Sequence, residues 1–259
     1  MGTPVARPGE AGRNARSGTS WLRLGLDLLC PPRCVLCREE SPTPDGGGPV
    51  VCGPCQRPLF HEAPRGPACG ESLPMAGACV GCRGPHDWDG IAILAAYDDR
   101  MRGLVLSGKR PGGEAVAAGL AALLVRRHRE TFAAWRPELV VPVPMHWLRR
   151  TLRGVDSAGE LARGVASGLG LQRRGVLRRI RPTPMQNRLP IGERRANVAA
   201  AFRATRRVDS KRVLLVDDVT TTGSTLAACR EALVAAGAAA VFAAVVARAD
   251  RNCTADGDT

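Results

Sequence analysis

Aromatic residues are scarce in this chain: only 3% of its 259 residues are Phe, Trp or Tyr. We therefore expect a core built of Ala, Val and Leu. Binding of single-stranded nucleic acid without sequence preference normally uses aromatic rings on which the bases stack. The candidates for such stacking are Tyr97, Trp135, Trp147 and Phe202. The shortage argues against a nucleic-acid site that works by stacking, but it leaves open one that works by charge.

Long apolar runs are missing as well. The longest, residues 232–247, is too short and too broken by glycine to span a bilayer, and it predicts a helix, a cap at Gly237 and then a strand. Residues 1–20 lack the apolar segment of a secretory signal and predict a disordered tail, as do residues 251–259. We expect no membrane insertion and a cytoplasmic location.

Positive charge is concentrated in one stretch. The chain has 37 Lys and Arg against 24 Asp and Glu, a net charge of +13, and residues 145–212 hold 17 of the basic residues. The acids in that stretch are Asp156, Glu160, Glu193 and Asp209. Such a block suits polyanions such as pyrophosphate, a nucleotide or nucleic acid. The alternative, which better explains most of the individual arginines, is a solvated arginine-rich surface.

Residues 213–225 offer a specific chemistry. Residues 213–216 predict a buried parallel strand, two acids close it, and small hydroxylated residues with one glycine lead into a helix. Ligands bind outside the carboxyl ends of parallel strands, and a loop at a helix N-terminus binds phosphate through its N–H groups. Carboxylates suit a sugar diol or a hydrated Mg²⁺. The stretch therefore predicts a ribose 5-phosphate site, with the diol at Asp217 and Asp218 and the phosphate at Thr221, Thr222, Gly223, Ser224 and Thr225.

The competing interpretation of this stretch is a plain strand–turn–helix whose acids only cap the helix. One capping acid is common, but two acids followed by Thr-Thr-Thr-Gly-Ser-Thr exceed what a cap needs. On either interpretation we expect Ser224 or Thr225 to cap the helix.

Eight of the ten cysteines lie in residues 30–86. Cys34 and Cys37 form one Cys-x-x-Cys pair, and Cys52 and Cys55 form another. This paired spacing lets four thiolates reach one tetrahedral Zn²⁺, with Zn–S distances of about 2.3 Å. Disulfides are the alternative, but they belong to oxidising compartments and would need an export signal. We expect a structural zinc site.

A second set of cysteines consists of Cys69, Cys79 and Cys82. It lacks an obvious fourth ligand, and the candidates are Cys30, His61 and His86. A set of three thiols without metal is the other interpretation. A redox-active Cys-x-x-Cys is a minor alternative, because no thioredoxin-like βαβ pattern surrounds it.

Strands and helices alternate from residue 91 onward. The predicted strands are 91–97, 139–144, 176–177 and 213–216, and the predicted helices are 101–106, 114–128 and 157–169. Lys109 lies in a Gly-Lys-Arg-Pro-Gly-Gly loop between the first two helices. The alternation predicts an α/β fold, an open and mostly parallel sheet with helices on both faces. We expect this domain at residues 89–250 and a small cysteine-rich module at residues 21–88.

The segment at residues 181–197 is long, basic and rich in proline. A loop of this length in a compact domain is usually functional or disordered. It predicts either a lid that closes over the phosphate site and excludes water or a mobile surface insertion.

The order of these motifs resembles a known family. Residues 213–225 resemble the phosphoribosyl pyrophosphate (PRPP) signature of type I phosphoribosyltransferases. The Cys-x-x-Cys module, the Val-Pro-Val-Pro of residues 141–144 and the Thr-Pro-x-Gln segment that opens residues 183–202 precede it, as in the ComF family. The resemblance covers nearly all of residues 30–248. The chain departs from it at residues 66–69, where many members have a Cys-x-x-Cys, and at residues 153–157, where many have Arg-Gly-Phe-Asn-Gln.

The resemblance implies a type I phosphoribosyltransferase-like fold with a zinc ribbon-like module. It also implies transfer at C1 of PRPP, with Mg²⁺ bridging the pyrophosphate and the ribose hydroxyls. The 6-oxopurine enzymes carry an acid where this chain has Thr221, which argues against hypoxanthine or guanine salvage. Arginines would stabilise the leaving pyrophosphate, and the candidates are Arg149, Arg150, Arg153, Arg188, Arg194 and Arg195.

Two functions follow as expectations. One is a phosphoribosyltransferase that binds PRPP or another phosphoribosyl ligand. The other, implied by the natural-transformation role of some ComF members, is a DNA-uptake factor that binds single-stranded DNA and uses PRPP or a nucleotide as a signal. No acid or histidine in the sequence stands out as a base for an acceptor.

Overall fold

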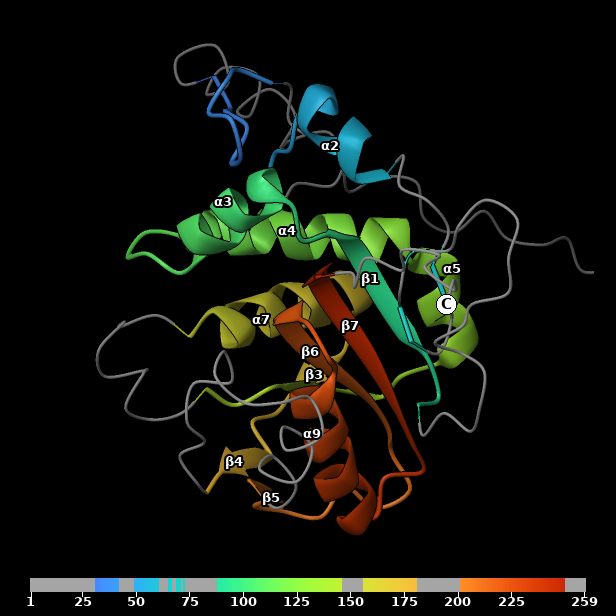
Figure 1. The fold of residues 1–259 in the computed structure, drawn as a ribbon. Helices are drawn as coiled ribbons and strands as arrows, with labels where there is room; N and C mark the ends of the chain where they lie inside the picture. Colours follow the sequence, from blue (N-terminus) through green and yellow to red (C-terminus); the bar gives the residue numbers. More distant parts are fainter. Residues whose placement is uncertain are drawn as a thin grey trace, which may run out of the picture.

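A single parallel sheet organises the molecule (Figure 1). The computed structural model describes residues 31–41, 49–60, 65–66, 69–70, 72, 88–145, 156–180 and 201–249. The strands, in spatial order, are β1 (Ile91–Ala96), β7 (Ala240–Arg248), β6 (Arg212–Thr220), β2 (Leu139–Pro142) and β3 (Gln172–Arg173). All four pairings between them are parallel, which confirms the predicted open parallel sheet.

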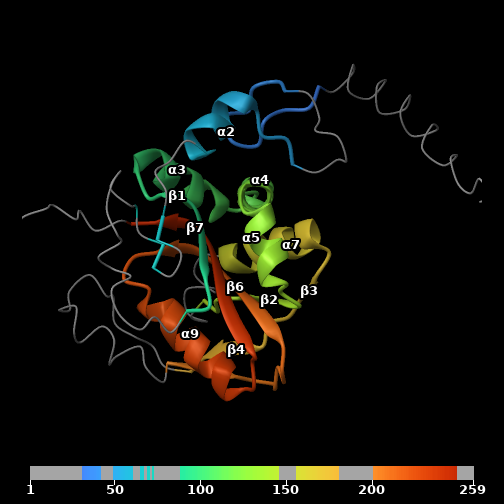
Figure 2. The same cartoon turned by 90° about the vertical axis from the view of Figure 1, so that its right-hand side faces the viewer.

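Helices cover both faces of this sheet (Figure 2). One face carries α3 (Asp99–Gly108), α4 (Glu114–Arg127), α5 (Arg129–Trp135) and α7 (Ser157–Leu169). The other face carries α9 (Ser224–Ala235) and the antiparallel pair β4 (Leu177–Arg179) and β5 (Phe202–Ala204). Because both faces are covered, residues 213–216 of β6 and 241–247 of β7 are buried, and apart from Phe242 they are all Val, Leu or Ala.

Small residues let α4 and α7 approach each other closely. A Cβ added at Gly164 would lie 2.6 Å from the Cβ of Ala121, and one added at Gly168 would lie 3.3 Å from Val125. The chain has few aromatic side chains to fill space, so it achieves a dense core by bringing the backbones together instead. Three aromatic rings are the exception: Phe132 and Trp135 of α5 meet edge to face, and Trp135 stacks on Phe242 of β7.

The cysteine-rich segment packs on the outer side of α4. Its helix α2 (Gly53–Phe60) lies above α4 in both views (Figures 1 and 2). A Cβ at Gly119 would lie 2.5 Å from Val35 and 3.3 Å from Val51. Arg126 of α4 donates to the side-chain oxygen of Gln56 over 2.7 Å. The segment therefore shares a continuous apolar core with the sheet domain.

Several predicted elements have different bounds or neighbours. The strand predicted at residues 213–216 is β6, which runs through both acids to Thr220. The short strand predicted at 176–177 is β4, which pairs with β5 outside the main sheet. Helix α5 was not predicted at all. Residues 146–155, which include three of the arginine candidates, and the loop predicted at 181–197 lie outside the described residues. Among the residues that are described, no helix is long and apolar enough to cross a membrane.

The close contact between α4 and α7 leads to a prediction about the free energy of unfolding. We expect Gly164→Ala to destabilise the protein by about 1–3 kcal/mol, because the new methyl group overlaps Ala121. Gly103→Ala on α3 is the matched control, since a Cβ there meets nothing within 4 Å, and it should stabilise by about 0.5–1 kcal/mol through helix propensity alone. Urea unfolding followed by circular dichroism measures both. Equal behaviour of the two variants would contradict this account of the packing.

Candidate functional site

The predicted ligand site lies where β6 passes into α9. β6 continues past the acids because its backbone keeps pairing with β7, through Asp217 with Val245 and on to Thr220 with Arg248. The prediction that the acids close the strand was therefore wrong by two residues. Thr221 begins the loop and is exposed, while residues 222–225 are half-buried.

The loop leaves the N-terminus of α9 without a side-chain cap. The N-cap is Gly223, with φ 76°, a left-handed conformation that glycine adopts without strain. The prediction that Ser224 or Thr225 caps the helix was wrong. The Ser224 hydroxyl instead lies 2.8 Å from the Thr222 hydroxyl, which also accepts a weak bond from the Ser224 N–H at 3.4 Å. Helix N–H groups and two hydroxyls therefore converge at one point, an arrangement that suits an anion.

The two acids face opposite sides of the sheet. Side chains alternate along a strand, so Asp218 shares a face with Val216 and Asp217 shares a face with Leu215. Val216 packs in the core beneath α4 and α7, and Leu215 packs in the core against α9. The sequence places the acids next to each other but does not reveal that they have different surroundings.

The Asp218 carboxylate joins three elements. One of its oxygens, Oδ2, accepts from the hydroxyl of Ser157, the first residue of α7, at 2.7 Å. The same oxygen lies 2.9 Å from the ammonium nitrogen of Lys109, which follows α3. The side chains of Lys109 and Asp218 are only 20% and 15% exposed. The positively charged side chain of Lys109 is therefore part of the site, although the sequence indicated only that Lys109 lies in a loop.

Asp217 has a more apolar environment. Its carboxylate accepts from the Asp218 backbone N–H at 2.9 Å. Burial, and then the negative charge of Asp218, raise its pKa well above the usual value for aspartate. On the facing helix α9, burial and then the charge of Asp217 raise the pKa of the Cys229 thiol. The two adjacent acids therefore differ, because Asp218 has a cation beside it and Asp217 is held in surroundings that oppose its ionisation.

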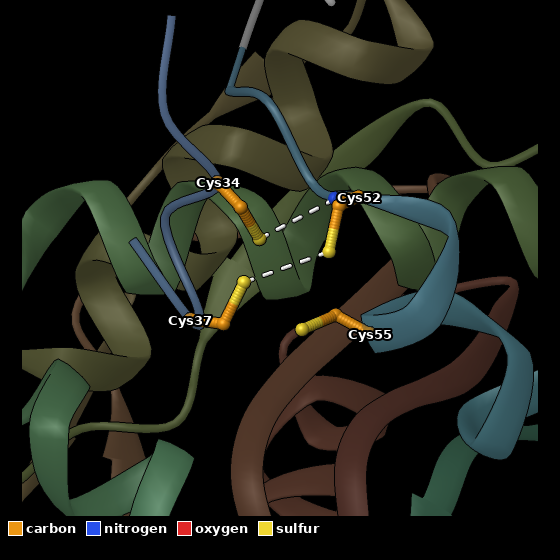
Figure 3. Close-up of side chains that lie close together, drawn as sticks. All are labelled: Cys34, Cys37, Cys52 and Cys55. Atoms are coloured by element: carbon orange, nitrogen blue, oxygen red, sulfur yellow. Dashed lines mark hydrogen bonds between the residues drawn. The ribbon is translucent and has the colours of Figure 1, made fainter. Parts of the chain in front are cut away.

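The first cysteine set is assembled as predicted (Figure 3). The sulfur atoms of Cys34, Cys37, Cys52 and Cys55 all lie within 4.8 Å of one another, and those of Cys37 and Cys52 are 3.6 Å apart. Tetrahedral Zn–S bonds of about 2.3 Å would require S···S distances of roughly 3.8 Å. The cysteines are free thiols, so the disulfide alternative does not apply to this set. The cluster therefore fits a four-coordinate metal ion.

The pKa values of the thiols also indicate that the cluster needs a cation if all four thiolates are to form. Burial alone would raise the pKa of Cys34, but backbone N–H groups, led by that of Cys37, lower it to about 6. Burial and hydrogen bonds with Cys52 and Cys37 raise the pKa of Cys55 to about 12. Four thiolates at this spacing repel one another, and a divalent ion at their centre offsets that repulsion.

Most of the other predicted ligands lie outside the described residues. Cys69 is half-buried and is not part of the four-cysteine cluster. Its predicted companions Cys79 and Cys82 lie outside the described residues. So do all six of the arginine candidates for pyrophosphate, which are Arg149, Arg150, Arg153, Arg188, Arg194 and Arg195.

Comparison with known proteins agrees with this geometry. A model of the phosphoribosyl transferase domain matches residues 113–258. DNA utilization protein YhgH of Salmonella typhimurium is 30% identical over 222 residues, which cover 83% of this chain and 96% of the relative. Competence protein F of Haemophilus influenzae is 30% identical over 203 residues, covering 75% of this chain and 87% of the relative. The chain belongs to the ComF family of phosphoribosyltransferase-domain proteins.

Solved structures include similar chains. The allosteric regulatory enzyme of purine biosynthesis is 25% identical with a TM-score of 0.35, over 50% of this chain and 25% of that one. A hypoxanthine phosphoribosyl transferase of Trypanosoma cruzi is 12% identical with a TM-score of 0.34, over 53% of this chain and 76% of that one. The match to the phosphoribosyl transferase domain model begins at residue 113, after β1 and α3. In this ComF chain β1 nevertheless belongs to the same sheet, because it pairs with β7.

Sequence reasoning missed two members of the site in this ComF protein. Ser157 was predicted only as the start of a helix, and Lys109 only as part of a loop. The available signal was topological, because Ser157 begins the helix that follows β2, and β2 is the direct neighbour of β6. Loops after adjacent parallel strands meet at one edge of the sheet, which is where Asp218 lies.

Proposed function

We propose that this ComF protein binds the ribose 5-phosphate part of PRPP at residues 213–225. Asp218 would accept from the ribose hydroxyls, and Asp217 would support it from the other face of β6 by accepting from the Asp218 N–H. Thr221, Thr222, Gly223, Ser224 and Thr225 would surround the 5′-phosphate. One observation supports this most strongly. A helix N-terminus that lacks a side-chain cap lies a few residues beyond a carboxylate already held in place by Ser157. Donors for a phosphate and acceptors for hydroxyls therefore come from one strand–loop–helix.

The residues at this site also fit a Mg²⁺ ion that arrives with the ligand. Mg²⁺ is usually bound through one or two carboxylates together with substrate phosphates, rather than by an all-protein cage. Asp218, half-buried on the α7 side of β6, supplies a carboxylate of this kind. Bound there, Mg²⁺ would neutralise charge on the pyrophosphate that leaves C1.

The chain's own residues would orient the ribose and stabilise the leaving group. Asp218 fixes the hydroxyl next to C1, so the reacting carbon is held relative to α7 and the α3–α4 loop. The arginine candidates Arg149, Arg150, Arg153, Arg188, Arg194 and Arg195 keep their proposed role at the pyrophosphate. An assay of pyrophosphate release from PRPP with candidate bases decides whether the bound ligand is a substrate or a signal.

The first prediction at this site concerns the acids. We expect Asp218→Asn to weaken PRPP binding roughly tenfold or more, because it removes a charge-assisted hydrogen bond. Asp217→Asn should weaken binding less, since the raised pKa of Asp217 makes its charge less complete. Calorimetry with PRPP and Mg²⁺ measures both. Glu231→Gln, an exposed acid on α9, is the control and should bind like the wild type. Wild-type affinity in the folded Asp217→Asn/Asp218→Asn variant would refute the assignment.

We also propose that Cys34, Cys37, Cys52 and Cys55 hold one structural Zn²⁺. The ion would connect the 34–37 turn to the start of α2, both of which pack on α4 through Val35 and Val51. Metal binding at such a site contributes directly to folding, because the unfolded chain has no preformed site.

The zinc proposal predicts about one Zn²⁺ per purified chain. Cys55→Ser should abolish stoichiometric zinc, and a loss of about 2 kcal/mol would lower Tm by roughly 4–8 °C in a protein of this size. Cys69→Ser is the matched control and should keep both the metal and the Tm. Elemental analysis and differential scanning calorimetry give the two readouts. The site would be ruled out by wild-type protein that is purified without chelator, contains no zinc and has Cys34, Cys37, Cys52 and Cys55 all titratable as free thiols.

A second candidate function is binding of single-stranded DNA. It is favoured by relatives whose names are DNA utilization protein and Competence protein F, and by the placement of part of the basic block. Exposed basic side chains from the residue after β3 and from the β5–β6 connection border one hollow of about 480 Å³. They are Arg174, Arg206, Arg207 and Lys211. Two of the four are paired with acids, Arg207 with Asp209 and Lys211 with Glu138.

This candidate predicts binding that depends on salt. Affinity for single-stranded DNA should fall as salt rises, because each neutralised phosphate releases counterions. Arg174→Gln/Arg206→Gln should reduce the slope of log affinity against log salt by about 1.4, at roughly 0.7 for each phosphate that is no longer neutralised. The control Arg100→Gln/Arg102→Gln changes two exposed arginines of α3 and should not alter the slope. Fluorescence anisotropy at several salt concentrations tests it, and an affinity that is flat with salt would contradict it.

A further inference from the structure

Lysine is almost absent from this protein, and one of its lysines lies at the candidate site. Of 37 basic residues only Lys109 and Lys211 are lysines. Lys211 is about half exposed and pairs with Glu138 at the amino end of the sheet. Lys109 is only 20% exposed and lies 2.9 Å from the carboxylate of Asp218.

The loop that carries Lys109 has a rigid backbone. The Lys109 N–H bonds back to the carbonyl groups of Leu106 and Ser107, which ends α3. Four residues later a Cβ at Gly113 would lie 2.3 Å from the Ser107 carbonyl oxygen, so only glycine fits the turn. The backbone of Lys109 is thereby fixed, while its four-carbon side chain can still rotate.

The ion pair engages one of the two carboxylate oxygens that a ribose hydroxyl could use. Asp218 Oδ2 already contacts both the Ser157 hydroxyl and the Lys109 ammonium group. A ribose hydroxyl that binds this same oxygen must therefore displace or share the lysine. In PRPP the hydroxyl-bearing carbon C2 is bonded directly to C1, which carries the pyrophosphate. An ammonium group that leaves Asp218 is then only a few ångströms from an anion with several negative charges.

We propose that Lys109 is a ligand-positioning residue that moves from Asp218 to the pyrophosphate when PRPP binds. This inference rests on the proposed function of residues 213–225. In the ligand-free protein the lysine neutralises Asp218 and keeps that carboxylate in place beside α7. In the complex the same charge contacts the group attached to C1. Lys109 would therefore discriminate PRPP from ribose 5-phosphate, which has the diol and the 5′-phosphate but no pyrophosphate.

A purely structural ion pair makes a different prediction. If Lys109 only holds the α3–α4 loop against β6, its removal should disturb Asp218 for every ligand alike. The two roles therefore separate when two ligands that share the ribose 5-phosphate part are compared.

Calorimetry of Lys109→Met with each ligand, in the presence of Mg²⁺, makes this comparison. We expect PRPP affinity to fall about ten- to a hundredfold, and ribose 5-phosphate affinity to stay the same or to rise because the lysine no longer competes for Asp218. Lys109→Arg keeps a positive charge and should restore most of the preference for PRPP. Arg110→Met, which removes the neighbouring exposed charge, is the matched control and should keep the wild-type preference.

Amine acylation of the wild-type protein gives a second readout that needs no variant. Mass spectrometry would follow the labelling of Lys109, with Lys211 as the internal reference in the same molecule. Ribose 5-phosphate should increase labelling of Lys109, because it competes for Asp218, whereas PRPP should keep Lys109 protected. Labelling that responds equally to both ligands would overturn the proposal.

The outcomes distinguish the role of Lys109 from the proposed ribose 5-phosphate site at residues 213–225. Equal losses of both ligands in Lys109→Met, or no loss of PRPP, overturn the role of Lys109 and leave the ribose 5-phosphate site intact. The same loss of preference in Arg110→Met would show a general effect of charge and also overturn it. Wild-type protein that binds neither ligand overturns both proposals together.

Discussion

The pairing of β6 with β7 on one side and with β2 on the other is the constraint on which the rest of the structure depends. It holds the strand rigid past the two acids, so that their positions are set by the sheet and not by a loop. It also determines which elements reach the acids, because the helix after β2 begins at the same edge and α9 leaves from the end of β6 itself. The site is therefore a consequence of strand order, with side chains from residues 109, 157 and 218 brought together across more than a hundred positions of sequence.

The strand alternation gives the adjacent acids different environments. Asp218 lies on the face of α7, where a hydroxyl and an ammonium group meet it, and Asp217 faces α9, where burial opposes its ionisation. Charges that are partly removed from water are stable only when they are paired. An arginine would meet that requirement equally well, so the presence of a lysine here agrees with the role proposed for Lys109. A compact ammonium group on a flexible stem can pair with one carboxylate oxygen and still leave it, whereas a planar guanidinium tends to form two bonds and hold on.

Much of the fold could be predicted from the sequence, and the reasons are specific. The helix at residues 157–169 and the strand near 91–96 have strong patterns and clear ends, and the structure has them at or near the predicted residues. The four-cysteine cluster could be predicted because Cys-x-x-Cys spacing is a local geometric property. The end of β6 could not, because its last residues are held by pairing with β7 rather than by their own preference for strand. The cap of α9 was also missed, since the Thr222 hydroxyl engages Ser224 and leaves Gly223 to make the turn.

The contacts of Lys109 were beyond sequence reasoning for a related cause. Nothing in a Gly-Lys-Arg-Pro-Gly-Gly loop identifies which basic residue points into the protein, and its partner lies more than a hundred residues away. Once the strand order is known, the loop between α3 and α4 can be placed near Asp218, because both helices cover the face of the sheet on which Asp218 lies. The cysteine module packs on the outer side of that same α4. α4 also begins directly after the turn that carries Lys109, so the module and this turn adjoin the same helix. The small cysteine-rich segment and the ligand site are in this way parts of one continuous core.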